Sequence, residues 1–260
     1  MRCQSRGGAW DGRLGPREAS RAEYIDSMFK SLLDIAWDGL PAQCEVCGAW
    51  PSRALCAACS SSFLRPQARC GSCALPAPAG QAQCGTCVLN APPLDACLAA
   101  VSYTYPWSAC IARFKYGGQA AWARPLAQLM LQAPGAAAAL QSCDMLLPMP
   151  LSAKRLAERG FNQAHELAKR LMPGKTRHGL LLRIRDTAPQ EQLGRAERER
   201  NMRGAFMAAP EAVPLLRGKR LLLIDDVMTS GASINEAAAA LKQGGAAWVT
   251  GLVFARTDSP

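Results

Sequence analysis

The stretch 221–256 constrains this chain most, because two apolar runs there flank an acid pair, a small loop rich in hydroxyls and an alanine-rich segment. The first run, residues 221–224, is a continuous block of Leu and Ile, typical of a parallel strand buried on both faces. The alanine-rich segment ends before Gly244 and Gly245, and a second apolar run follows at 248–255. This order predicts a strand–loop–helix–strand unit within a parallel sheet, with a helix that stops at the two glycines.

The acid pair, Asp225 and Asp226, directly follows the first apolar run. Ligands of parallel sheets bind at the carboxyl ends of the strands, so we predict a binding site at this position. Ser233 and Glu236 have the S-x-x-E spacing of a capping box, which would mark the start of the helix. Neither a Walker A sequence nor a G-x-G-x-x-G pattern precedes that helix, which disfavours nucleoside triphosphates and dinucleotides as ligands.

The loop between the acid pair and the helix suits a phosphate. Thr229, Ser230 and Ser233 offer hydroxyls, Gly231 permits close approach of the backbone, and the start of a helix presents free N–H groups to an anion. Carboxylates instead suit vicinal hydroxyls or a hydrated Mg²⁺ ion. A solvated strand end is the plainer interpretation of the acid pair alone, but the whole stretch favours a ribose 5-phosphate. It resembles the phosphoribosyl diphosphate (PRPP) binding motif of type I phosphoribosyltransferases.

Eight of the twelve cysteines lie in four C-x-x-C pairs. One such loop directs two thiolates at a tetrahedral ion, and two loops complete a structural zinc site. Disulfides are the alternative, but we find no export signal, and a cytosol keeps thiols reduced. We therefore expect one or two zinc ions. The first and second C-x-x-C pairs would share one ion and the third and fourth pairs the other, although an interleaved arrangement of the pairs is an alternative. The expected ligands are Cys44, Cys47, Cys56, Cys59, Cys70, Cys73, Cys84 and Cys87.

Composition indicates a folded protein with anionic partners. Hydrophobic residues make up 49% and charged residues 19%, and the net charge of +10 favours phosphorylated small molecules or nucleic acid. No apolar run is long enough for a membrane span, and the first 27 residues contain no signal-peptide core. We expect a cytoplasmic protein with a disordered extension over 1–27, an amphipathic helix over 28–43, a cysteine-rich module over 44–90 and a larger domain over 94–260.

Three further segments are candidates for the site. Around Lys115, the charges are either solvated or functional. The segment after Pro150 carries Ser152 and Arg155 and predicts a second anion site, continuing as one amphipathic helix through residue 171. Residues 187–203 are polar and dense in mixed charge, which fits either a solvated helix or a mobile basic flap that closes over a ligand.

Together these segments resemble the ComF/GntX family of phosphoribosyltransferase-like proteins. The matching pieces are FKYGG (114–118), PMPLSAKRLAERGFNQ (148–163), TAPQEQLGRAERERNMRGAF (187–206) and LLLIDDVMTSGAS (221–233). The module over 44–90 looks like that family's double zinc ribbon, and residues 94–260 look like its phosphoribosyltransferase domain.

The resemblance implies an α/β fold of the type I phosphoribosyltransferase kind, a parallel sheet flanked by helices. It also implies a Mg²⁺-dependent glycosyltransferase in which Asp225 and Asp226 hold the ribose diol and steady the developing positive charge. The remaining PRPP-binding residues implied are Thr229, Ser230, Gly231, Ala232 and Ser233 for the 5-phosphate, Leu151, Ser152 and Arg155 for the pyrophosphate, and Arg195 or Arg198 from the flap.

Two functions of different kinds follow from this resemblance. The first is transfer of phosphoribose from PRPP to an unidentified acceptor, which the resemblance links to DNA uptake and competence. The alternative is a protein that handles single-stranded DNA or meets the competence machinery in natural transformation and uses the fold as a ligand sensor. Aromatic residues make up only 6%, and no aromatic–basic interleaving is seen, which disfavours direct strand binding.

Overall fold

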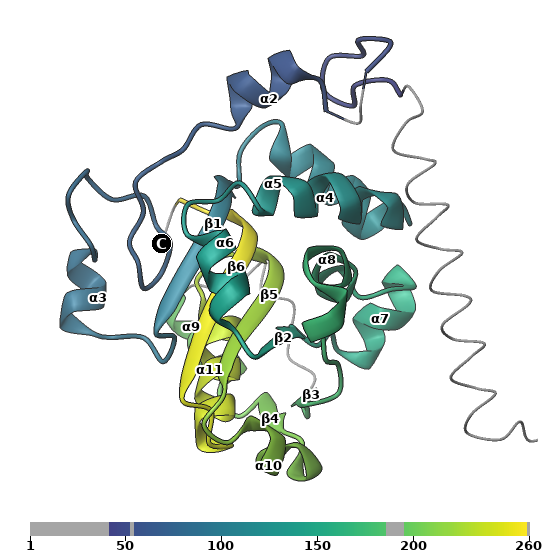
Figure 1. Cartoon of the computed structure of the whole chain (residues 1–260). Helices are drawn as coiled ribbons and strands as arrows, with labels where there is room; N and C mark the ends of the chain where they lie inside the picture. The colour runs from purple at the N-terminus through teal and green to yellow at the C-terminus, as the bar shows by residue number, and fades with distance from the viewer. Residues whose placement is uncertain (1–41, 53–54, 186–194, 259–260) are drawn as a thin grey trace, which may run out of the picture.

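The protein is built on a four-stranded parallel sheet (Figure 1). The computed structural model describes residues 42–52, 55–185 and 195–258, so the predicted extension over 1–27 and nearly all of the predicted helix over 28–43 lie outside the described residues. The strand order is β1-β6-β5-β2. The strands are β1 (Ala96–Ser102), β2 (Met145–Pro148), β5 (Arg220–Met228) and β6 (Trp248–Arg256). The predicted parallel sheet is confirmed.

Helices cover both faces of this sheet, which explains the continuous apolar run in β5. Leu221 and Leu223 point to one face and pack with α11 (Ala232–Gln243), whereas Leu222 and Ile224 point to the other. The helices on that second face are α4 (Trp107–Tyr116), α5 (Ala123–Met130), α6 (Ala136–Ser142) and α8 (Gln163–Leu171). A strand covered on both sides needs apolar residues at successive positions rather than at alternate ones.

The remaining elements lie around this sheet. Strand β3 (Leu181–Arg183) pairs antiparallel with β4 in a separate two-stranded sheet, where Leu181 lies opposite Ala208. These other elements are α2 (Ala57–Phe63), α3 (Gly85–Leu89), η1 (Ala120–Trp122), α7 (Ala153–Arg159), η2 (Pro173–Lys175), β3 (Leu181–Arg183), α9 (Arg195–Met202), β4 (Phe206–Ala208), η4 (Pro210–Ala212) and α10 (Val213–Leu216).

The strand–loop–helix–strand unit forms as predicted, with a different helix start. Helix α11 ends at Gln243, just before Gly244, as expected, but it begins at Ala232 with Gly231 as its N-cap, and no side chain caps it. The predicted capping box is therefore wrong. The carboxylate of Glu236 instead accepts a hydrogen bond from the backbone N–H of Gly204, at 2.5 Å, and so ties α11 to the turn after α9.

The segment after Pro150 contains two helices rather than the one predicted. Gly160 has a φ of 76°, in the left-handed region, and ends α7. Asn162 then caps α8, because its side chain accepts a hydrogen bond from the N–H of His165. A glycine in this conformation followed by an Asn cap stops one helix and starts another within three residues.

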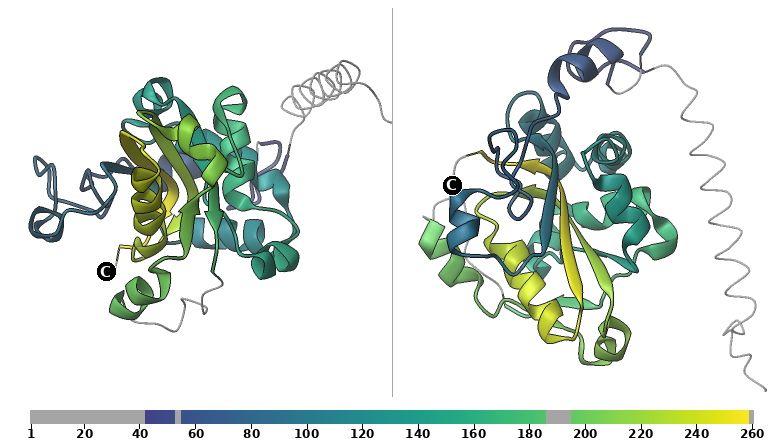
Figure 2. Two further views of the ribbon diagram at one scale, coloured as in Figure 1. Left: turned by 90° about the horizontal axis from the view of Figure 1, so that it is seen from below. Right: turned by 60° about the vertical axis from the view of Figure 1, so that its left-hand side comes forward.

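The cysteine-rich module lies at the periphery of the sheet. Helix α3 stands away from the body of the protein on the side of β1, the edge strand, and α2 lies near α4 (Figures 1 and 2). None of the helices in the described part of the chain combines the length and apolar character that a membrane crossing requires.

Candidate functional site

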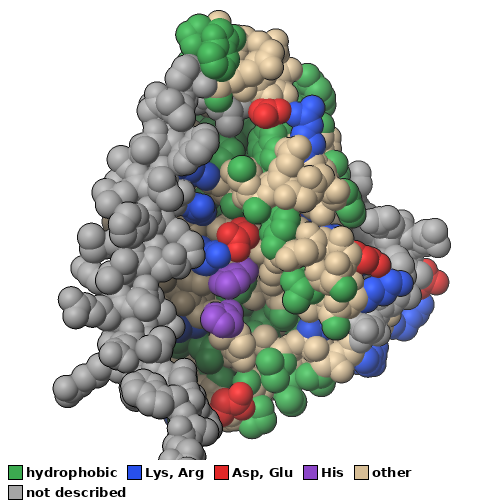
Figure 3. All heavy atoms as spheres, turned by 90° about the vertical axis from the view of Figure 1, so that its right-hand side faces the viewer, with side chains coloured by type: hydrophobic (Ala, Val, Ile, Leu, Met, Phe, Trp, Pro, Cys, Tyr) green, Lys and Arg blue, Asp and Glu red, His purple; other side chains and the backbone are tan. Residues whose placement is uncertain are grey.

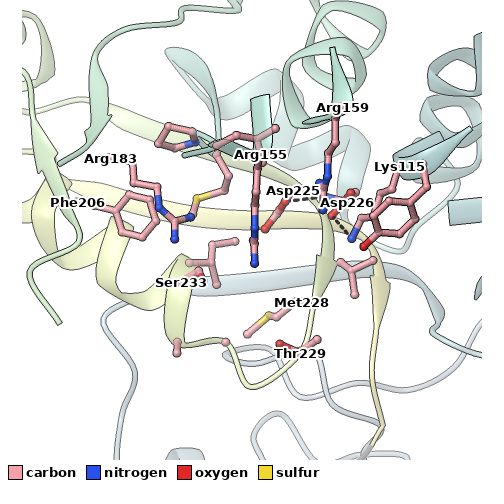
Figure 4. A pocket seen from close by; sticks show the side chains of 18 residues that line it. Lys115, Arg155, Arg159, Arg183, Phe206, Asp225, Asp226, Met228, Thr229 and Ser233 are labelled. Atoms are coloured by element: carbon pink, nitrogen blue, oxygen red, sulfur yellow. Dashed lines mark hydrogen bonds and ion pairs between the residues drawn. The ribbon is translucent and has the colours of Figure 1, made fainter. Parts of the chain in front are cut away.

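A cavity of about 200 Å³ opens where β5 and β2 end (Figure 4). It combines acidic, basic, hydroxyl and apolar side chains from β3, β4, β5, α4, α7 and α11. The residues that line it are Lys115, Tyr116, Met149, Pro150, Leu151, Arg155, Arg159, Arg183, Phe206, Asp225, Asp226, Val227, Met228, Thr229, Gly231, Ala232, Ser233 and Ile234. The predicted location, at the carboxyl end of the strand carrying the acid pair, is therefore a cavity.

The acid pair lies in the second half of β5, at the centre of this cavity. The backbone N–H of Asp226 donates to the carboxylate of Asp225 at 2.9 Å. The Asp226 side chain is only 8% exposed, and its Oδ1 lies 3.2 Å from the Lys115 ammonium. Its Oδ2 is buried and has no hydrogen-bond partner among the described residues. Leaving such an oxygen unpaired is costly, because a buried acceptor has lost its hydrogen bonds to water.

Asp225 has an unusual affinity for protons. Burial raises the pKa of this carboxyl to about 7, the neighbouring charge of Asp226 adds to the rise, and Lys115 and Arg159 oppose it. Removal from water disfavours the charged form of a carboxyl group, and a second carboxylate nearby acts in the same direction. Asp225 therefore changes charge close to neutral pH, so the charge of the site depends on pH in this range.

The loop after β5 places backbone groups at the cavity. Gly231 has a φ of 84°, and a Cβ atom there would lie 2.6 Å from the Cε of Met228, so the loop favours glycine at this position. The hydroxyl of Ser230 accepts a hydrogen bond from the N–H of Ala232 at 3.3 Å. The first N–H groups of a helix have no acceptor within the helix, and α11 directs this end at the cavity.

Four cationic side chains surround the acid pair (Figure 4). Lys115 comes from the end of α4, Arg155 and Arg159 from α7, and Arg183 from β3. The guanidinium of Arg159 lies over the ring of Tyr116, and that of Arg183 over Phe206, with 5.4 and 5.6 Å to the ring centroids. Four cations against two carboxylates, one of which has a raised pKa, suit a ligand with several negative charges.

The structure brings most of the predicted site residues together. Asp225, Asp226, Thr229, Gly231, Ala232, Ser233, Leu151 and Arg155 all line the cavity. Ser152 and Ser230 do not; the buried hydroxyl of Ser152 caps α7 by accepting from the N–H of Arg155 at 3.3 Å. Arg195 and Arg198 belong to α9, but their side chains are outside the described part of the structure.

Sequence reasoning assigned no role to Arg183 and Phe206. Arg183 lies in none of the segments that match the family, and Phe206 is the last residue of the matching segment 187–206. The pairing of β3 with β4 brings the two side chains to the cavity together. The sequence left two interpretations of Lys115, a solvated helix charge or a functional residue. Its ion pair with Asp226 places its side chain in the cavity. The FKYGG sequence was the signal for Lys115 and Tyr116.

The two histidines of the chain lie outside this cavity. His165 and His178 are neighbours, with ring centroids 5.3 Å apart, on the face that Figure 3 shows. Burial lowers the pKa of His165, and Lys169 lowers it further. Neither histidine lines the cavity.

The eight module cysteines form two groups of four. The groups are Cys44, Cys47, Cys56 and Cys59, and Cys70, Cys73, Cys84 and Cys87, each with its Sγ atoms within 4.8 Å of one another. The first and second C-x-x-C pairs therefore lie in one group and the third and fourth in the other, as predicted from the sequence. One Sγ–Sγ distance in each group, Cys47 to Cys56 and Cys73 to Cys84, is 3.7 Å. Zn–S bonds of about 2.3 Å in a tetrahedron place neighbouring sulfurs about 3.8 Å apart.

In each group, backbone N–H groups favour the thiolate form of one cysteine, whereas burial raises the pKa of Cys59, Cys73 and Cys87. Burial alone would raise the pKa of Cys70, but N–H groups of the Cys84 and Ser72 backbone outweigh it and lower the pKa to about 7. The N–H of Cys84 lies 3.2 Å from the Cys70 sulfur. In the first group, N–H groups of Cys47 and Cys56 likewise outweigh burial and lower the pKa of Cys44 to about 6. Both groups could hold a metal ion, and their all-sulfur donor set suits zinc.

Comparison with known proteins places the cavity in a known type of domain. A family model described as phosphoribosyl transferase domain matches residues 156–258, which include the acid pair and α11. The chain is 31% identical over 176 residues to the DNA utilization protein YhgH of Salmonella typhimurium, a match that covers 64% of this chain and 74% of that protein.

Two proteins named for competence are also similar. Competence protein F of Haemophilus influenzae is 31% identical over 147 residues, covering 54% of this chain and 64% of that protein. Competence protein ComFC of Bacillus subtilis is 34% identical over 114 residues, covering 44% and 45% of the two chains.

Proposed function

The chain belongs to the ComF family, and on that premise we propose that its cavity binds PRPP with Mg²⁺ and transfers the phosphoribosyl group to an acceptor. One observation carries this proposal: a single cavity joins an acid pair, a loop at a helix start and four cationic side chains. PRPP has groups that match all three, namely a ribose diol, a 5-phosphate and a pyrophosphate.

The acid pair would hold the ribose diol. The hydroxyls of a diol donate hydrogen bonds, and the side chains of Asp225 and Asp226, which line the cavity, can accept them. In the unliganded site Lys115 neutralises Asp226. A bound ribose would share that carboxylate with Lys115, so the buried charge stays compensated in both states.

The two charged ends of PRPP would lie on either side of the diol. The loop of Thr229, Gly231 and Ser233, with the N–H groups that begin α11, suits the 5-phosphate. Arg155 and Arg159 from α7 suit the pyrophosphate, because a guanidinium binds phosphate oxygens in pairs. Arg195 and Arg198 remain proposed contributors from the flap.

This arrangement supports substitution at the ribose C1. The bond from C1 to the pyrophosphate oxygen breaks, and its electron pair leaves with the pyrophosphate. Positive charge then develops on the ribose ring, where the carboxylates of Asp225 and Asp226 stabilise it. The acceptor nucleophile bonds to C1 and loses a proton. Mg²⁺, held mainly by substrate oxygens and water, would neutralise the leaving group.

Calorimetric titration with PRPP and Mg²⁺ tests the proposal. We expect saturable binding by the wild type and its loss in the Asp225→Asn/Asp226→Asn variant. Glu211→Gln, which changes an exposed carboxylate on η4, is the matched control and should bind as the wild type does. Binding that survives the double substitution would show that the acid pair does not hold the ligand, and absence of binding by the wild type would refute PRPP as the ligand.

Handling of single-stranded DNA is a second candidate function. The names of the relatives, DNA utilization protein and Competence protein F, and the net charge of +10 favour it. Anisotropy of a labelled oligonucleotide should then fall steeply as salt rises from about 50 to 200 mM, because phosphate contacts release counterions. Oligonucleotide binding that PRPP changes would connect the two functions, whereas no binding at low salt would leave the transferase proposal alone.

We also propose zinc as the metal of both cysteine groups. Four thiolates at tetrahedral spacing form a closed structural site, which contributes to folding rather than to chemistry. Cysteines stay reduced, and so available as zinc ligands, in a reducing compartment, so the proposal fits a cytoplasmic location.

A further inference from the structure

Arg256, the last residue of β6, is an arginine buried within the fold. It is 2% exposed, although its guanidinium is always charged. A buried guanidinium has to find acceptors for its N–H groups, and their fixed planar arrangement determines where those acceptors lie. Arg256 therefore fixes the positions of its hydrogen-bond acceptors relative to one another.

These partners belong to two separate parts of the protein. On one side, Nε donates to the backbone carbonyl of Cys73, in the second cysteine group, at 2.9 Å. On the other side, Nη1 donates to the backbone carbonyls of Met228, at 3.2 Å, and Thr229, where the loop leaves β5. Nη1 also donates to the carbonyl of Thr257 at 2.7 Å. One side chain thus joins the turn of a metal site to the loop that lines the cavity.

A second connection between the same two parts passes through β1. The N–H of Cys97 donates to the carbonyl of Gly71, between the first two cysteines of the group, at 2.7 Å. The thiol of Cys97 lies 3.5 Å from the sulfur of Met228. Ala74, which follows Cys73, is fully buried in the hydrophobic core of the sheet. The turn 70–74 is consequently seated against the body of the domain.

The first cysteine group is attached at a different place. Glu45 forms an ion pair with Arg113 of α4, and both side chains are exposed, at 42% and 50%. The indole N–H of Trp107 donates to the carbonyl of Phe63 at the end of α2. These contacts lead to α4, at the other side of the cysteine module, so this group provides a matched comparison.

We propose that Arg256 is a positioning residue that makes the geometry of the loop 229–233 depend on metal occupancy of the second cysteine group. The identification of this loop as the phosphate-binding loop rests on the proposed function. A bound zinc ion fixes the turn 70–74 and hence the carbonyl of Cys73, and Arg256 passes this constraint to the carbonyls of Met228 and Thr229. Without the metal the turn keeps only its contacts with β1 and the core, so the carbonyl of Cys73 is held less firmly and the carbonyls of the loop lose a fixed partner.

Hydrogen exchange measured on the full chain without ligand tests this coupling. The variants are Cys70→Ser/Cys73→Ser for the second group and Cys44→Ser/Cys47→Ser for the first, with zinc content measured for each. The backbone carbonyl at position 73 remains in the first variant, so any effect comes from the metal rather than from a missing acceptor. We expect amides 229–233 to exchange at least about tenfold faster when the second group is empty. The variant of the first group should exchange there as the wild type does.

Arg256→Lys provides an independent test, because it keeps the positive charge and all the cysteine ligands. A lysine has no planar group that could donate to the carbonyl of Cys73 and to the carbonyls of Met228 and Thr229 at the same time. We expect the same faster exchange in 229–233 with zinc content unchanged. Amides 221–224 of β5 report on the sheet as a whole and should keep their wild-type rates in every variant. Wild-type exchange in the loop after zinc loss from the second group would overturn the proposal. Faster exchange that also includes 221–224, or that follows equally from either cysteine group, would overturn it as well.

The binding of PRPP completes the test. If PRPP binds the wild type, Arg256→Lys and the variant of the second group should each raise its dissociation constant about tenfold, and the variant of the first group should not. If the wild type binds no PRPP, the proposed function fails, and the exchange rates of 229–233 still decide whether metal and loop are coupled.

Discussion

The ion pair between Lys115 and Asp226 leads to a quantitative prediction. Their charged atoms are 3.2 Å apart, and the two side chains are 18% and 8% exposed. At an effective dielectric constant of about 20, the attraction is about 5 kcal/mol. Residual water around Lys115 screens part of it, so we expect a coupling free energy of about 2 to 3 kcal/mol.

A double-mutant cycle with Lys115→Met and Asp226→Asn measures this coupling. Each single substitution leaves a buried charge without its partner, whereas the double substitution removes both charges. Urea denaturation at pH 8 gives the free energy of unfolding of the four proteins. The double variant should therefore be more stable than the sum of the two single effects predicts.

An exposed pair in the same protein serves as the control. Lys169 and Glu166 on α8 are 2.7 Å apart, closer than the buried pair, but their side chains are 47% and 22% exposed. The corresponding cycle should give less than about 1 kcal/mol. A coupling free energy for Lys115 and Asp226 no larger than that of this surface pair would refute the reasoning that burial strengthens the ion pair.

Three further outcomes are expected. Because the pKa of Asp225 is raised to about 7, this carboxyl stays protonated in the folded protein between about pH 4 and 7, where it is ionised in the unfolded chain, so the free energy of unfolding falls as pH rises through this range. Urea denaturation of Asp225→Asn should no longer show that fall, and the substitution should stabilise the protein at pH 8 by at most about 4 kcal/mol. PRPP affinity should rise between about pH 6 and 8 as Asp225 ionises, beyond any rise that Asp225→Asn shows; equal pH profiles would contradict this role. Gly231→Ala should destabilise the protein more than Gly118→Ala. Both substitutions cost about 1 to 2 kcal/mol because both glycines are left-handed, but only at position 231 would the new Cβ atom also clash with Met228. Equal melting temperatures of the two variants would contradict this.

The central unit of the fold was predictable because its signals are local. A continuous apolar run, an acid pair and a pair of closing glycines lie within one stretch, and the structure forms β5, α11 and β6 from it. The capping box failed because a distant group, the N–H of Gly204, takes the carboxylate of Glu236. The spacing S-x-x-E indicates which bonds are available, but the tertiary contact decides which one forms.

The rest of the site depends on contacts between distant segments. The helical period from Leu156 to Ala164 predicted one helix, although Gly160 and Asn162 contained the signals for two. Ser152 has the right side chain for an anion, but its hydroxyl is used to cap α7. No periodicity indicates that Arg183 reaches the cavity, because its position follows from the pairing of β3 with β4.

The central claim is that one cavity recognises both ends of PRPP and the ribose between them. Affinities of the wild type for PRPP, ribose 5-phosphate and pyrophosphate, each measured by calorimetry with Mg²⁺, test it most directly. We predict that PRPP binds at least about tenfold more tightly than either part, a difference of about 1.4 kcal/mol or more. Pyrophosphate binding as tightly as PRPP would contradict the claim, because the cavity would then be a general site for polyanions.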